Sequence, residues 1–151
     1  MSSVIVEHVM LLPLMLIGIV LFSATANAAV LNYVNQQIEV IAQGAINQMT
    51  SLTQQLYYAL DQENIASCNV TLTRPMPELI GSYTYDIYAT ATVNNELSLS
   101  LFVSGVTVQV EKIIVLSPNA QWNDSHYRSI SSTAAIKVEK SVNGTLLFSF
   151  M

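Results

Sequence analysis

Residues 9–31 read VMLLPLMLIGIVLFSATANAAVL, and this stretch decides how the rest of the chain can fold. No Asp, Glu, Lys, Arg or His lies between His8 and Glu39. About 20 consecutive apolar residues are enough for a helix to cross the hydrocarbon core of a bilayer. The stretch is therefore long and apolar enough to span a membrane.

Apolar residues continue after this stretch in steps of three and four, the spacing of one helix face. They are Leu31, Val34, Ile38, Ile41, Ala45, Met49, Leu52, Leu56 and Leu60. We predict one helix over residues 3–60, roughly 85 Å long at 1.5 Å per residue. The small domain that follows cannot bury such a helix. The helix therefore needs a membrane, other copies of itself, or first one and then the other to cover its apolar surface.

The face opposite the apolar one is rich in amides and hydroxyls. Between Asn32 and Gln55 it carries Asn, Gln, Thr and Ser, and Glu39 is its one charge. A solvated helix normally carries Lys and Glu there. An uncharged amide face instead favours packing against neighbouring subunits, because hydrogen bonds form without the cost of burying charge.

Charge and cysteine content exclude several classes of function. The chain has 5 Lys and Arg against 10 Asp and Glu, and the first cation is Arg74. Without a basic cluster, neither nucleic-acid binding nor a basic membrane-surface anchor is expected. Cys68 is the one cysteine, so no disulfide framework or thiolate metal cluster is expected. We interpret it as a small buried hydrophobe.

A secretory signal peptide is the main alternative for the apolar stretch. Ala26-Asn27-Ala28 fits a cleavage site. However, the residues before the apolar stretch contain Glu7 and no Lys or Arg, whereas a signal peptide begins with positive charge. The helical pattern also runs through the cut into Leu31. We therefore favour a retained membrane span.

From Cys68 onward the apolar period changes from 3.6 to 2, which predicts a separate β-domain. The expected division is a helical segment over 1–63 and a β-domain over 64–151. The predicted strands are 68–73, 83–93, 97–103, 106–110, 113–116, 136–139 and 145–150. Lys112 breaks the alternation, so a bulge or a strand covered on both sides is expected there. Residues 117–133 are predicted as the longest loop. Six or seven antiparallel strands predict an Ig-like β-sandwich, and the whole chain is α+β.

Catalytic and metal motifs are weak. Asp124-Ser125-His126 contains the residue types of a catalytic triad, but sequence neighbours cannot adopt its geometry. His8 and His126 are the only histidines, and no metal-ligand spacing is present. All glycines are isolated, so no phosphate loop is expected. We predict no enzyme activity, no metal and no cofactor, and we assign Tyr83, Tyr85 and Tyr88 to sheet packing.

Three Asn-x-Ser/Thr sequons lie in the β-domain, at Asn69, Asn123 and Asn143. Such sequons are N-glycosylation acceptors on extracellular surfaces. Asn123 and Asn143 are the first candidates because loops are exposed. Asn69 lies in a predicted strand and must face outward to be modified.

Glu7 is the most informative single residue about function, because a carboxylate at the edge of an apolar span is costly without a partner. It either complements the helix dipole at the membrane surface or pairs with the amino terminus of a neighbouring subunit.

Residues 3–9, SVIVEHV, and the order of a long apolar helix before a sequon-rich β-domain resemble the archaeal type IV pilin superfamily. This superfamily includes archaeal pilins, archaellins and archaellum stator subunits. Glu7 is fifth from Ser3, where many pilins carry a glutamate thought to guide assembly. The resemblance implies that the helices leave the membrane to form a filament core, with glycosylated β-domains outside. The assembly residues it implies are Glu7, Leu11, Leu14, Gly18, Leu31, Val34, Ile38, Ile41, Ala45, Leu52 and Leu56.

One feature departs from the family pattern. Archaeal prepilins carry Lys or Arg just before their cleavage site, and Met1-Ser2 has neither. The sequence is then either nearly mature or that of an unprocessed, stator-type relative.

The expected function is a structural subunit of an extracellular filament for adhesion or motility. Its partners would be copies of itself, the bilayer before assembly and glycans on Asn, without nucleic acid. The alternatives are a membrane-anchored β-sandwich that binds a surface polymer or partner protein, and a β-domain secreted after cleavage at Ala28.

Overall fold

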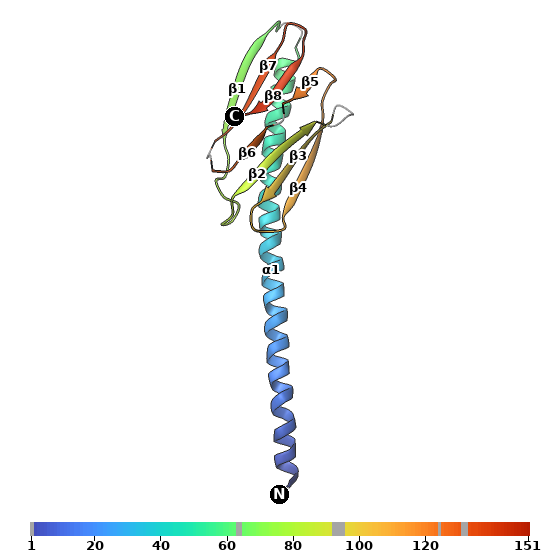
Figure 1. Ribbon diagram of the computed structural model, residues 1–151, viewed down its shortest axis with the longest axis vertical. Helices are drawn as coiled ribbons and strands as arrows, with labels where there is room; N and C mark the ends of the chain where they lie inside the picture. Colours follow the sequence, from blue (N-terminus) through green and yellow to red (C-terminus); the bar gives the residue numbers. More distant parts are fainter. Residues whose placement is uncertain (1, 63–64, 92–95, 124, 131–132) are drawn as a thin grey trace. The chain divides into compact units, whose positions relative to one another are not determined.

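The computed structural model describes residues 2–62, 65–91, 96–123, 125–130 and 133–151, with the backbone alone for 2–10, 74 and 133. One helix precedes eight named strands (Figure 1). They are α1 (Ser2–Leu60), β1 (Cys68–Pro75), β2 (Tyr85–Ala91), β3 (Glu96–Val103), β4 (Gln109–Val115), β5 (Ala120–Trp122), β6 (His126–Arg128), β7 (Thr133–Lys140) and β8 (Leu146–Phe150).

The long helix confirms the sequence prediction, since α1 runs from Ser2 to Leu60 and includes Pro13. Hydroxyl groups in its apolar part bond to the helix backbone. Ser23 Oγ donates to the carbonyl of Ile19 at 2.8 Å, and Thr25 Oγ1 donates to the carbonyls of Leu21 and Phe22. These bonds satisfy polar groups that would be costly in an apolar environment.

The chain forms two compact units, residues 1–37 and residues 38–151. In the first unit, the described side chains from Leu11 to Val34 are exposed along the helix. In the second unit, residues 38–60 of α1 bury one face against the strands. The buried residues of this face are Ile38, Ala42, Ala45, Ile46, Met49, Thr50, Leu52, Thr53, Leu56, Tyr57 and Leu60.

Leu31 and Val34 of the predicted apolar face are exposed, and within residues 38–60 the predicted apolar residues are buried except at one turn. Ile41 is 43% exposed, whereas Ala42 is fully buried and Ile38 is 3% exposed. Ile41 and Ala42 follow Ile38 by three and four residues, so either can share its helix face. Ile41 is the more hydrophobic of the two and was therefore the predicted buried residue. The small Ala42 side chain lies on the buried side, which leaves Ile41 at the edge of the face.

The strands form two four-stranded sheets, in the orders β1-β7-β8-β5 and β4-β3-β2-β6 (Figure 1). The named pairings are antiparallel except for β5 with β8, which is parallel. The antiparallel part of the prediction is therefore confirmed for most of the fold and wrong for this pair. The Ig-like arrangement of the sandwich stays a prediction.

Two details of the predicted β-domain are wrong. The pairing of β3 with β4 runs without interruption from Glu96 opposite Val115 to Phe102 opposite Gln109, so Lys112 causes no bulge within it. Ile113 and Val115 are exposed, so that strand is not covered on both sides. The predicted loop 117–133 contains β5 and β6.

Alternating residues of the strands meet the helix in one hydrophobic core. Tyr85, Ile87 and Ala89 of β2 are buried, as are Leu97, Leu99, Leu101 and Val103 of β3. Ile136 and Val138 of β7 and Leu146, Phe148 and Phe150 of β8 complete the same cluster. The period-2 assignment of inward faces is confirmed in these strands.

A polar cluster from separate strands and loops holds the end of α1. Lys140 Nζ donates to the carbonyls of Leu60 at 2.6 Å and Gln62 at 2.8 Å. Asp61 accepts hydrogen bonds from the Asn119 amide at 2.8 Å and the Tyr57 hydroxyl at 2.9 Å. The Asn119 contact, followed by that of Tyr57, holds the pKa of Asp61 below its ordinary value. Lys140 thus satisfies the carbonyl of Leu60 at the helix end and also bonds to that of Gln62, just beyond the helix.

Candidate functional site

The exposed apolar surface of α1 is the first candidate functional surface. Leu11, Leu14 and Leu31 are each more than half exposed, and Val34 is 41% exposed. A Cβ atom at Gly18 would meet nothing within 4 Å, so this glycine leaves an open position on the helix. Large apolar side chains contiguous over so many turns are unusual on a protein surface in water.

The residues that the resemblance assigns to assembly divide into two groups. Leu11, Leu14, Gly18, Leu31, Val34 and Ile41 are exposed and free to meet a membrane or another chain. Ile38, Ala45, Leu52 and Leu56 are buried against their own β-strands. The latter group therefore holds the 38–151 unit together. The side chain of Glu7 lies outside the described residues.

This helix has the length and composition of a membrane span. Within the part of the chain that the structure describes, α1 from Leu11 to Leu60 is long and apolar enough to cross a membrane, and its most apolar part is not buried. A membrane anchor and a signal sequence near an N-terminus share this property.

The three sequon asparagines are all exposed. Asn69 lies on the edge strand β1 opposite Glu139, so it meets the requirement for an outward-facing side chain. Asn123 follows β5, and Asn143 lies in the turn before Gly144, whose φ of 80° suits glycine. Each is accessible to a modifying enzyme.

Two residues of the triad-like motif, Ser125 and His126, are engaged elsewhere. The Ser125 hydroxyl donates to the carbonyl of Asn123 at 3.1 Å and accepts from the amide of Phe150 at 2.8 Å. The His126 ring stacks on Tyr88, with centroids 5.4 Å apart. Asp124 lies outside the described residues. Among the side chains that the structure describes, no three His, Cys, Asp or Glu residues gather as metal ligands.

The three tyrosines assigned to packing differ in burial. Tyr85 is fully buried, its hydroxyl donates to the carbonyl of Pro77 at 2.6 Å, and burial raises its pKa well above the ordinary value. Tyr83 is half-buried. Tyr88 is 40% exposed and lies on the outer face of its sheet. Packing is confirmed for Tyr85, and Tyr88 is a surface residue.

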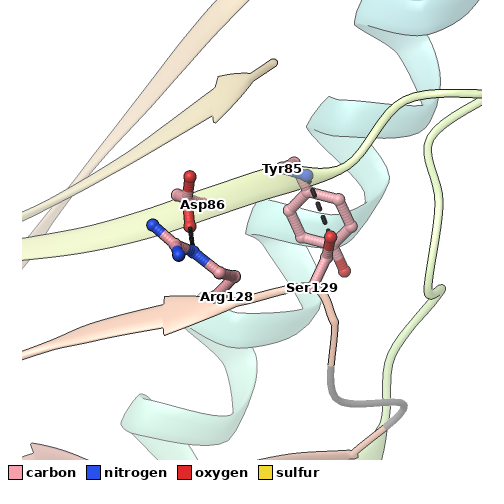
Figure 2. Close-up of polar contacts among 4 residues, drawn as sticks. All are labelled: Tyr85, Asp86, Arg128 and Ser129. Carbon is pink, nitrogen blue, oxygen red and sulfur yellow. Dashed lines mark hydrogen bonds and ion pairs between the residues drawn. The ribbon is translucent and has the colours of Figure 1, made fainter.

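The residues around Tyr85 fix β2 against β6. Figure 2 shows the Tyr85 amide donating to Ser129 Oγ at 2.9 Å and Arg128 Nε donating to Asp86 Oδ1 at 2.9 Å. The hydrogen bond to Asp86 raises the pKa of Arg128 above its ordinary value. These bonds hold Tyr85 and Asp86 on opposite faces of β2.

An outer aromatic surface was missed at the sequence level. Phe102 is exposed beside Tyr88, at a centroid distance of 5.6 Å. The alternation of side chains along a strand contained a signal for both residues. Tyr88 is two residues from the polar Asp86 and Thr90, and Phe102 follows Ser98 and Ser100 at the same spacing, so both rings belong to the polar face. No local pattern indicated that His126 would join them.

Comparisons with protein-family models, curated proteins and solved structures found no match to this chain. The observations define an α+β chain with one long apolar N-terminal helix and two sheets rich in antiparallel pairing.

Proposed function

We propose that this chain is a structural subunit of an extracellular helical filament, assembled by bundling of its N-terminal helices. The observation that carries the proposal is the exposed apolar surface of α1 from Leu11 to Val34, which has no charged residue. Burying one large aliphatic side chain is worth about 1.5–3 kcal/mol. A surface with many such residues therefore has a strong drive to leave water.

A bilayer and a bundle of identical helices both satisfy this drive. The helix would rest in the membrane before assembly and exchange lipid for neighbouring helices afterwards. Ala24 and Ala28 are four residues apart on one helix face and would favour the exchange, because small residues let helices approach closely in lipid.

The exposed face of α1 in the 38–151 unit extends the argument beyond one membrane span. Val40, Ile41 and Tyr58 are exposed there, and Gly44 and Asn47 lie between them along the helix. This face is apolar or uncharged over about five turns. Such a face favours contact with neighbouring subunits over contact with water.

The β-strands would then form the outside of the filament. Asn69 on β1, and Asn123 and Asn143 in the segments between strands, are exposed, as a glycosylated outer surface requires. Adhesion and motility are both compatible roles for such a filament.

A membrane-anchored, monomeric ectodomain is the second candidate. It is favoured by the length of the apolar stretch 9–31, which is enough for one membrane span. In that case Val40 and Ile41 would contact no other chain. A variant at the exposed face separates the two candidates.

The test is the double substitution Val34→Asp with Ile41→Asp, in the full chain. Both side chains are exposed in the single chain, so the β-strands should stay folded while charge is placed in the proposed helix bundle. The matched control is Val142→Asp with Ile130→Asp, which changes the same residue types at exposed positions outside the helix. The proposal expects filaments from the control and none from the helix variant. Normal filaments from the helix variant would exclude a bundled core.

A further inference from the structure

The outer face of the sheet β4-β3-β2-β6 carries an aromatic group that is not used by the core or by the proposed assembly surface. Strand register places Tyr88 opposite Ser100 of β3 and His126 of β6. The same register places Asp86 opposite Phe102 and Arg128. Three aromatic rings from three strands therefore meet on one solvent-facing surface.

The rings hold one another in a defined geometry. His126 and Tyr88 stack with centroids 5.4 Å apart and planes 17° apart. Phe102 meets Tyr88 in an edge-to-face contact at 5.6 Å and 79°. These are favourable arrangements for aromatic pairs, so the rings are ordered before any ligand arrives.

Tyr88 separates two shallow hollows. The larger, of about 530 Å³, is lined by Asp86, Tyr88, Thr90, Ser100 and Phe102. The smaller, of about 370 Å³, is lined by Tyr88, Ala89, Thr90, Ser125 and His126. Both volumes fall within the range of about 300–1,000 Å³ found for small-ligand sites. Because the hollows share Tyr88 and Thr90, they suit an elongated ligand with repeating units.

The polar groups around the rings are hydroxyls, one ion pair and the carboxylate of Glu111, which lies opposite Ser100 and accepts a hydrogen bond from Ser98. Asp86 accepts a hydrogen bond from Arg128 Nε, so their charges cancel, while Thr90 and Ser100 provide hydroxyls. Arg128 is bound to Asp86 through Nε, and its side chain is 58% exposed. An anionic ligand would face the carboxylate of Glu111 beside the Asp86–Arg128 pair. A cationic ligand would have to displace Arg128 from Asp86, or the Ser98 hydroxyl from Glu111. A neutral ligand meets neither obstacle.

We propose that this surface binds a neutral oligosaccharide. A pyranose ring combines an apolar face of C–H groups with a rim of hydroxyls. The electron-rich face of an aromatic ring attracts polarised C–H groups, and the hydroxyls of Thr90 and Ser100 with the Asp86–Arg128 pair offer hydrogen bonds to the rim. The ligand is a free or surface-bound oligosaccharide from outside the chain. The proposal goes beyond filament assembly and does not depend on it.

The experiment titrates cellohexaose and chitohexaose into the full chain, held in detergent micelles and made in a host without N-glycosylation. Binding is followed by calorimetry. Both probes are neutral and β-linked, and each of their rings offers a flat C–H face. The proposal expects at least one of them to bind, with an affinity that falls about tenfold or more in Tyr88→Ala and in Phe102→Ala.

Two further variants keep the test decisive. Ser100→Leu fills the larger hollow with an aliphatic side chain, adds and removes no aromatic ring, and should also abolish binding. Ile113→Ala, on the outer face of the neighbouring strand but outside both hollows, is the control and should bind like the parent chain. The near-ultraviolet circular dichroism of each variant reports whether its fold is intact.

Failure of both oligosaccharides to bind the folded parent chain would overturn the proposal. Equal binding by folded Tyr88→Ala, Ser100→Leu and parent chains would overturn it as well. Binding of a cationic or anionic peptide that is lost in Tyr88→Ala, without binding of either oligosaccharide, would identify a protein contact instead. None of these results bears on filament formation, which is scored separately by electron microscopy.

Discussion

Lys140 offers the clearest test of how the β-strands hold the end of α1. Lys140 is 8% exposed, and its ammonium group donates to two carbonyls, those of Leu60 at 2.6 Å and Gln62 at 2.8 Å. The substitution Lys140→Met keeps most of the aliphatic stem and removes the donor. It therefore isolates the polar contact from the packing of the stem.

The expected loss follows from these two bonds. Hydrogen bonds to charged groups contribute about 1.5–3 kcal/mol each, and a cation at a helix C-terminus adds about 0.3–1 kcal/mol. Removing a nearly buried charge also removes its desolvation cost, which offsets part of the loss. We expect a net destabilisation of about 2–4 kcal/mol, or a lowering of the unfolding midpoint by about 4–16 °C.

The assay is thermal unfolding of the full chain in micelles, followed by tryptophan fluorescence. Trp122 is the one tryptophan, and its buried ring packs on Phe148 and Phe150 at 5.6 and 5.0 Å, so it reports on the β-strands. The matched control is Lys137→Met, on the same strand. Lys137 forms a partly exposed ion pair with Glu139, and such pairs are worth about 0–1 kcal/mol. Equal midpoints for the two variants would refute the capping role of Lys140.

Three further predictions concern assembly, acid stability and modification. Glu7→Gln should slow filament formation if Glu7 pairs with a neighbouring amino terminus, as measured by light scattering; an unchanged rate leaves the helix-dipole role. The lowered pKa of Asp61 contributes stability that is present above its unfolded value, near 3.9, and is lost as pH falls through the folded value. Asp61→Asn should therefore make stability less dependent on pH between about 5 and 2, and an unaltered acid transition would contradict the role of Asn119. Asn123→Gln and Asn143→Gln should each remove one glycan mass from the chain made in its native host, and a parent mass equal to that of the bare polypeptide would exclude N-glycosylation.

Long-period features of this fold could be predicted from sequence. The helix prediction ended at Leu60, as α1 does, because the apolar spacing of three and four residues persists over many turns. Tyr85, Ile87 and Leu99 were placed on inward faces because alternation over seven or eight residues is a strong signal.

Short and non-local features could not be predicted. The strands β5 and β6 have three residues each, which is too short to show a period, and their pairing with β8 and β2 depends on distant residues. The burial of Ala42 in place of Ile41 depends on how closely the strands approach the helix. The stacking of His126 on Tyr88 joins residues from different strands for the same reason. Tertiary packing decided each of these.

Electron microscopy of the purified native protein tests the central proposal most directly. The account predicts long filaments of constant width, with the helices of residues 2–60 packed together at the centre and the β-strands outside. Discrete particles that persist only in detergent, at every concentration and temperature tried, would contradict a filament subunit and indicate a membrane-anchored ectodomain.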